Sequence, residues 1–182
     1  MKKICRWALI GFTILPLAAG DLFCVERGRP LRALNRIESK VRHELVMLPY
    51  YTVFDNLEFT VKEHIIALRG QVTNPTLKSD AENAVKRIEG VERVVNRIEV
   101  LPVSPADDRI RRAVYFTLYS ERSPLFRYGR GAQPPIHIIV RNGHVTLVGL
   151  VDNVSDKNTA GLLANQVSGV FSVRNSLRVD RG

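Results

Sequence analysis

The sequence predicts an α+β fold in which one small unit occurs twice, and two observations support this prediction. Residues 68–100 align with residues 147–179 without a gap, and 11 of the 33 aligned positions are identical. Each aligned segment is preceded by short apolar stretches with strand periodicity and, before them, by a stretch with helical periodicity. We therefore expect two α-β-β-α-β units, each with two helices packed on one face of a small three-stranded mixed sheet.

The first helix of each unit is indicated by apolar residues at intervals of three and four. It is expected over residues 36–48 in the first unit and directly after Asp107 and Asp108 in the second. Acidic side chains stabilise the N-terminal turn of a helix, so this pair suits a helix start. The apolar positions of the two helices are Ile37, Val41, Leu45 and Leu48, and Ile110, Val114 and Leu118.

A β-hairpin is expected after each of these helices. In the second unit Asn142 and Gly143 lie between two apolar stretches, and Asn-Gly is typical of a two-residue turn that requires positive φ. The sequence Lys-Glu-His occupies the same place in the first unit, with weaker turn chemistry. The strand segments are residues 57–61, 65–68, 136–140 and 145–148.

The second helix of each unit is expected to end at a glycine, Gly90 or Gly169, because glycine readily adopts the left-handed conformation of a C-terminal cap. The last strand follows, over residues 91–100 in the first unit and at the aligned residues in the second. Roles in turns and caps, rather than ligand contacts, are predicted for Gly70, Gly90, Asn142, Gly143, Gly149 and Gly169.

The N-terminal residues have the pattern of a secretory signal: a basic start, a short uncharged apolar run and then small residues. The apolar run, residues 7–19, is shorter than the roughly 20 residues that span a bilayer. Cleavage would place the mature protein in the periplasm or outside the cell, and retention as a membrane anchor is the alternative. The predicted organisation is signal peptide 1–20, N-terminal arm 21–33, first unit 34–102, linker 103–106 and second unit 107–180.

Cys24 is the only cysteine outside the predicted signal, so an intramolecular disulfide in the mature chain is excluded. A lipid acceptor and an incidental thiol are its two interpretations. Phe23 precedes it where a lipid-attachment motif has a small residue, which favours the thiol.

Both units resemble the BON domain. The resemblance rests on an Arg-Gly or Val-Gly after an apolar strand, a helix ending in Gly-Val, and a following strand with Val-x-Asn. The segments that carry it are LKSDAENAVKRIEGVERVVNRIEVLP and PIHIIVRNGHVTLVGLVDN, and it extends over about residues 34–180. It implies a non-enzymatic envelope protein that binds phospholipid surfaces or other proteins and supports envelope integrity or stress tolerance. It implies no catalytic motif and no cofactor.

The basic residues are concentrated in the second unit. Residues 34–102 contain ten Lys or Arg and ten Asp or Glu, whereas residues 107–182 contain eleven and six. A basic excess favours anionic partners, so an anionic phospholipid surface is expected to contact the second unit. The candidate lipid-binding residues are Arg112, Tyr115, Tyr119, Arg122, Phe126, Arg127, Tyr128 and Arg130. The alternative for the aromatic residues, Phe116 included, is packing in the core.

Other functions find less support in the sequence. The four histidines are scattered without the spacing of metal ligands, and no nucleophile or phosphate-binding motif occurs. Nucleic acid is not expected as a partner, because the chain carries an export signal and lacks paired strand aromatics. The principal alternative is a protein-interaction module of an envelope complex such as a secretin or channel, with envelope proteins as partners. An ion sensor is a third possibility, without an oxygen-rich loop to support it. The oligomeric state is left open.

Overall fold

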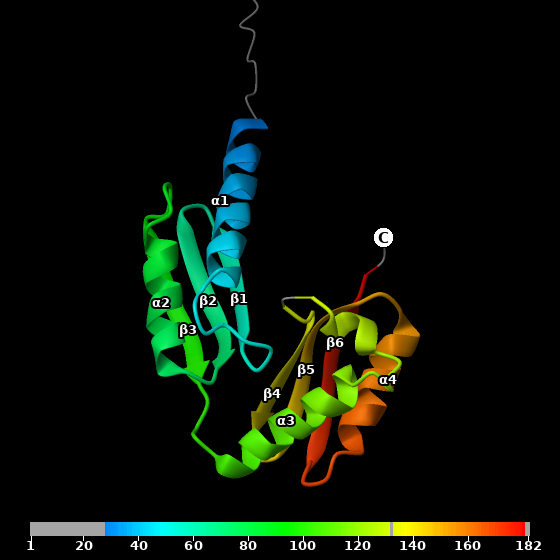
Figure 1. Ribbon diagram of the computed structural model, residues 1–182. Helices are drawn as coiled ribbons and strands as arrows, with labels where there is room; N and C mark the ends of the chain where they lie inside the picture. Colours follow the sequence, from blue (N-terminus) through cyan, green and yellow to red (C-terminus); the bar gives the residue numbers. More distant parts are fainter. Residues whose placement is uncertain (1–27, 132, 181–182) are drawn as a thin grey trace, which may run out of the picture.

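The computed structural model describes residues 28–131 and 133–180 and confirms two α+β units in succession (Figure 1). The first consists of α1 (Gly28–Val46), β1 (Asn56–Lys62), β2 (Ile65–Val72), α2 (Pro75–Lys86) and β3 (Arg93–Val100). The second consists of α3 (Pro105–Tyr119), the 3₁₀ helix η1 (Phe126–Gly129), β4 (Ile136–Arg141), β5 (His144–Val151), α4 (Val154–Asn165) and β6 (Ser172–Val179). The predicted signal and Cys24 lie outside the described residues. Helix α1 begins at Gly28, inside the segment expected to be an arm.

Each unit contains one three-stranded mixed sheet. The strand order is β1-β2-β3 in the first and β4-β5-β6 in the second. The hairpin strands pair antiparallel, and the last strand runs parallel to the central one. The two helices of a unit pack against one face of its sheet, as expected from their apolar stripes, and the opposite face has no helix of its own unit on it (Figure 1).

The repeated glycines are explained by the backbone. Gly70 has φ +121° and Gly149 has φ +133°, and a Cβ atom at either position would lie 1.9 Å from a carbonyl oxygen of the neighbouring strand segment, that of Asn56 or Pro135. Only glycine permits both the conformation and the approach. The other residues with predicted turn or cap roles also have positive φ: Gly90 (92°), Asn142 (51°), Gly143 (78°) and Gly169 (87°). The prediction that the second helices end at these glycines is wrong, because α2 ends at Lys86 with Arg87 as its C-cap and α4 ends at Asn165 with Gln166 as its C-cap. Gly90 and Gly169 lie in the turns that follow and lead to the last strands.

The repeated asparagines connect the last strand of each unit to its second helix. The side-chain amide of Asn96 donates to the carbonyl oxygen of Lys78 at 2.9 Å, and that of Asn175 donates to the carbonyl oxygen of Lys157 at 2.6 Å. Lys78 and Lys157 lie inside the second helices, so each asparagine side chain ties the last strand of its unit to the helix that precedes it. The identity at this position therefore has the same structural cause in both units.

The two units are joined by more than the linker. Residues 47–55, the connection between α1 and β1, pack against the second unit, and Val53 belongs to the second hydrophobic core. The amide of Ile138, in the edge strand β4, donates to the carbonyl oxygen of Val53 at 2.8 Å. The connection thus adds a contact to an edge that would otherwise be open.

The buried carboxylate of Asp55 holds this connection in place. It accepts hydrogen bonds from the amide and hydroxyl of Thr52 at 2.9 and 2.7 Å, and from those of Thr73 at 2.7 and 2.9 Å. A buried charge is tolerated only when its oxygens are satisfied, as these are. Asp55 therefore fixes the segment that reaches the second unit to the end of β2.

Side chains complete the boundary between the units. The rings of Tyr51 and His137 stack with centroids 5.6 Å apart, and an ion pair joins Arg141 to Glu99 at 2.5 Å. The first of these contacts is half-buried and the second is exposed. The units touch mainly through residues 47–55.

Candidate functional site

The outward face of α3 is the strongest candidate surface in the basic second unit. Ser104 caps the helix by accepting from the amide of Asp107, and the buried side of the helix carries Ile110, Val114 and Leu118. This packing turns Arg109, Arg112 and Phe116, which lie at intervals of three and four, toward solvent. Phe116 is 66% exposed.

Neither Arg109 nor Arg112 forms an ion pair with another described residue, whereas the nearby Arg111 does. Arg111 is buried, pairs with Asp108, and donates to the carbonyl oxygen of Val140 at 2.8 Å. It therefore anchors α3 to β4, while its two neighbours leave their charges available to an external anion.

Two of the predicted aromatic residues are not on this surface. Tyr119 is 6% exposed and donates its hydroxyl proton to the carbonyl oxygen of Ile136 at 2.7 Å. Tyr115 is half-buried, with its ring 5.1 Å from that of Tyr119 and 6.1 Å from that of Phe54. These rings pack against the second core and cannot enter a membrane without leaving it.

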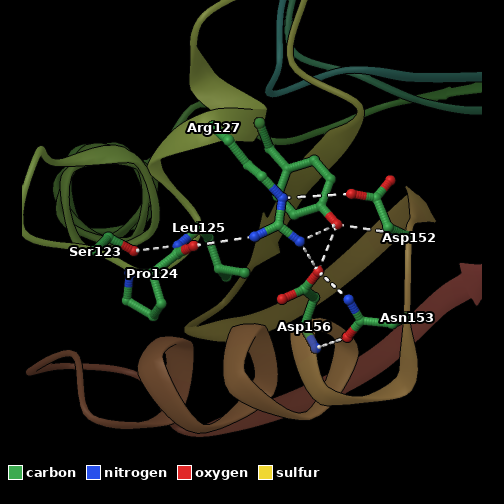
Figure 2. Close-up of polar contacts among 8 residues, drawn as sticks. Ser123, Pro124, Leu125, Arg127, Asp152, Asn153 and Asp156 are labelled. Atoms are coloured by element: carbon green, nitrogen blue, oxygen red, sulfur yellow. Dashed lines mark hydrogen bonds and ion pairs between the residues drawn. The ribbon is translucent and has the colours of Figure 1, made fainter.

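The loop after α3 is fixed by a polar network shown in Figure 2. The guanidinium of Arg127 forms ion pairs with Asp152 and Asp156, and its central carbon lies over the ring of Tyr128, 4.7 Å from the ring centroid. The Tyr128 hydroxyl donates to Asp156 at 2.6 Å and accepts from the amide of Asp152 at 2.9 Å. Asn153, the N-cap of α4, also donates to Asp156, at 2.9 Å. Arg127 and Tyr128, predicted as lipid contacts, thus connect η1 to the start of α4.

Burial keeps both tyrosine hydroxyls protonated. Loss of hydration and, to a smaller extent, the bond to Asp156 raise the pKa of Tyr128 to about 12. Burial also raises the pKa of Tyr119, against the smaller effect of its bond to Ile136. Both groups therefore act as neutral hydrogen-bonding partners at physiological pH.

The remaining predicted residues lie nearer to solvent. Arg122 and Arg130 are exposed, and Phe126 is half-buried, with the guanidinium of Arg130 5.9 Å from its ring centroid. We call Arg109, Arg112 and Phe116 on this helix, together with Arg122 in the turn that follows it, the α3 surface. Sequence reasoning did not include Arg109 or Phe116 among the candidates. The spacing of Arg109, Arg112 and Phe116 was the available signal.

Neither a metal site nor a membrane-spanning helix is found among the described residues. Across residues 28–131 and 133–180, no group of three or more His, Cys, Asp or Glu side chains is arranged to hold a metal ion. No helix in the part of the chain that the structure describes is long and apolar enough to cross a bilayer.

Comparison with known proteins gives one curated relative and a family. The outer membrane lipoprotein DolP of Haemophilus influenzae is 35% identical over 109 residues, which cover 59% of this chain and 54% of that protein. The chain thus spans about half the length of this relative. The C-terminal domain of CdsD, a structural protein of the type III secretion system of Chlamydia trachomatis, is 13% identical, covers 78% of this chain and 96% of its own, and has a TM-score of 0.31. That likeness supports no conclusion here.

The family match covers both units. The BON domain family matches residues 33–102 and residues 106–181, which together make up most of the chain. These two segments contain the two mixed sheets, the repeated glycines and the repeated asparagines described above. The protein therefore belongs to the BON domain family, as a tandem of two such domains.

Proposed function

We propose that the protein is a non-enzymatic component of the cell envelope that binds anionic phospholipid surfaces through the α3 surface of its second BON domain. The likeness to a protein named as an outer membrane lipoprotein supports the envelope location, periplasmic or exported and in contact with a membrane. Binding of this kind would support envelope integrity or stress tolerance.

The observation that carries the proposal is the exposed ring of Phe116 beside unpaired arginines on the same helix face. An aromatic ring gains free energy when it moves from water into the interfacial region of a bilayer, and arginine can reach phosphate oxygens from there. Each basic residue near an anionic surface contributes about 1 kcal/mol. Arg109, Arg112 and Arg122 together provide usable binding that salt would weaken.

Co-sedimentation with vesicles tests the proposal. Vesicles of phosphatidylcholine mixed with phosphatidylglycerol are expected to bind the protein, and vesicles of phosphatidylcholine alone are not. The double variant Arg109→Glu, Arg112→Glu reverses two charges and should weaken binding by at least about tenfold. Phe116→Ala removes the ring and should weaken it by about tenfold, equivalent to about 1.4 kcal/mol.

The matched control is the double variant Arg36→Glu, Lys40→Glu, which removes the same charge from exposed positions of α1 in the first domain. It should bind vesicles almost as the parent protein does. Equal losses in the two double variants would mean that net charge, rather than the α3 surface, determines binding. Vesicle binding that does not depend on the charge of the lipid would contradict the proposal and favour a protein-interaction module.

A further inference from the structure

The sheet faces that lack helices border a cleft between the two domains. The cleft has a volume of about 930 Å³ and is lined by β1 and β2 from the first domain and by β5 and β6 from the second. A second cavity of about 580 Å³ shares Gln71, Thr146 and Arg174 with it and continues it toward the β4–β5 turn. Together they form one groove between the sheets.

Arginines from both domains line this cleft. Arg69 projects from the outer face of β2, Arg174 and Arg178 project from the outer face of β6, and Arg42 enters from α1. None of the four forms an ion pair with a described residue. The acids of the cleft are Glu38 and Glu58, so the lining carries an excess of positive charge.

One wall of the cleft is the open edge of a sheet. Residues 56–61 of β1 line it without interruption, so the strand presents its edge as well as one face. In the part of the chain that the structure describes, β2 is the single strand paired with β1. The outward amide and carbonyl groups of such an edge can pair with another extended chain.

We propose that the cleft binds an extended acidic segment of a partner protein, which adds as a strand to the edge of β1. Its backbone would pair with β1, and its carboxylates would meet Arg69, Arg174 and Arg178. Arginine suits this role because its planar guanidinium binds a carboxylate with two parallel hydrogen bonds. An open edge strand flanked by arginines selects an extended acidic peptide over a compact phosphate group, which has no use for the edge.

The first test uses a fluorescein-labelled peptide in which glutamate alternates with valine, with fluorescence anisotropy as the readout. The full-length protein is expected to bind it in a saturable and salt-dependent way. Two further peptides have the same sequence and charge but carry N-methyl groups on alternate amides, one on the odd-numbered and one on the even-numbered residues. In one of them the amides that would pair with β1 are blocked, and this peptide should bind at least about tenfold more weakly. Equal affinity of all three peptides would overturn the strand addition.

The second test changes the arginines. The double variant Arg174→Glu, Arg178→Glu should weaken peptide binding by at least about tenfold. Its matched control is Arg87→Glu, Arg93→Glu, which reverses two exposed arginines of the first domain that neither line the cleft nor pair with a cleft arginine. The control should bind like the parent protein, and an equal loss in both would overturn the assignment of the site.

This inference can fail independently of the proposed function. The cleft variant should keep its binding to phosphatidylglycerol vesicles, and the α3 variant Arg109→Glu, Arg112→Glu should keep its binding to the peptide. The peptide proposal is wrong if the cleft variant Arg174→Glu, Arg178→Glu loses vesicle binding and the parent protein does not bind the peptide. The arginines of the cleft would then bind a lipid headgroup.

Discussion

The two BON domains differ most in the connection between the first helix and the hairpin. In the first domain residues 47–55 leave their own domain, and Val53 enters the core of the other. In the second domain the corresponding connection folds back, and Arg127 and Tyr128 attach it to the start of α4. The same position in the fold thus joins the domains in one copy and stabilises a single domain in the other.

The domains also differ in surface charge, although their backbone frameworks agree. Gly70 and Gly149, and Asn96 and Asn175, play the same roles in both. The first domain has no net charge, while the second carries the basic excess and the α3 surface. After duplication the framework residues were retained, and the connection and the exposed faces diverged.

The largest loss of stability is expected from substitutions of the glycines that both domains share. Gly70→Ala and Gly149→Ala each place a Cβ 1.9 Å from a carbonyl oxygen, in a conformation that alanine rarely adopts. Each should destabilise its own domain by about 3 kcal/mol or more. Hydrogen exchange followed by mass spectrometry would locate the loss. Gly131→Ala is the control, because its Cβ would lie 3.6 Å from the nearest atom. A mild effect in one domain alone would show that the frameworks are not equivalent.

The next largest effect is expected from a change in residues 47–55, the connection that joins the domains. Asp55→Ala removes the carboxylate that accepts four hydrogen bonds and should cost about 2–3 kcal/mol of folding free energy. It should also loosen the packing of Val53, so that the radius of gyration measured by small-angle X-ray scattering increases. Asp152→Ala, at a carboxylate that is 66% exposed, should change neither quantity much. An unchanged radius in a destabilised variant would show that the domains are held together elsewhere.

A smaller loss of stability is expected from a change in the connection of the second domain, which folds back onto its own domain. Tyr128→Phe removes the hydroxyl that bonds to Asp156 and to the amide of Asp152, and it should cost about 1–2 kcal/mol in denaturant titration. Tyr50→Phe, at an exposed ring, should cost almost nothing. Vesicle binding should be unchanged in both. Weaker lipid binding by a still folded Tyr128→Phe would restore Tyr128 as a lipid contact.

The smallest effect is expected from the pH dependence of folding stability, through His137 at the domain boundary. Burial lowers the pKa of His137 below its ordinary 6.5, against the smaller opposing effects of the Asp55 and Thr52 backbone and the Asp55 charge. The neutral ring therefore contributes stability that is present above pH 6.5 and is lost as the pH falls toward the lowered pKa. Denaturant midpoints against pH should fall more steeply for the parent protein than for His137→Phe. His43→Gln, at an exposed position, should follow the parent.

Local patterns predicted most of the fold because the residues that define it act over short distances. A helical stripe, an Asn-Gly turn and a glycine with positive φ in a turn each determine the backbone within a few residues. The alignment of the two copies then gave the number of domains. The start of α1 at Gly28 was not predicted, because the apolar stripe before Ile37 gives no clear boundary.

The candidate site was predicted less well, because a helical stripe does not say which neighbours will cover it. The spacing placed Arg112, Tyr115 and Tyr119 together, but the loop around η1 and residues 47–55 cover the two tyrosines. Phe116 is one position away from Tyr115 and points to solvent. The difference depends on segments that are distant in sequence.

The sequence by itself determined the tandem BON architecture, the glycine and asparagine framework and the basic character of the second half. The tertiary structure alone decided that Val53 joins the second core, that Arg127 and Tyr128 serve the fold, and that arginines of both domains share a cleft. The physical reason is range: turns, caps and periodicity depend on neighbouring residues, whereas burial and the pairing of charges depend on which surfaces meet after folding.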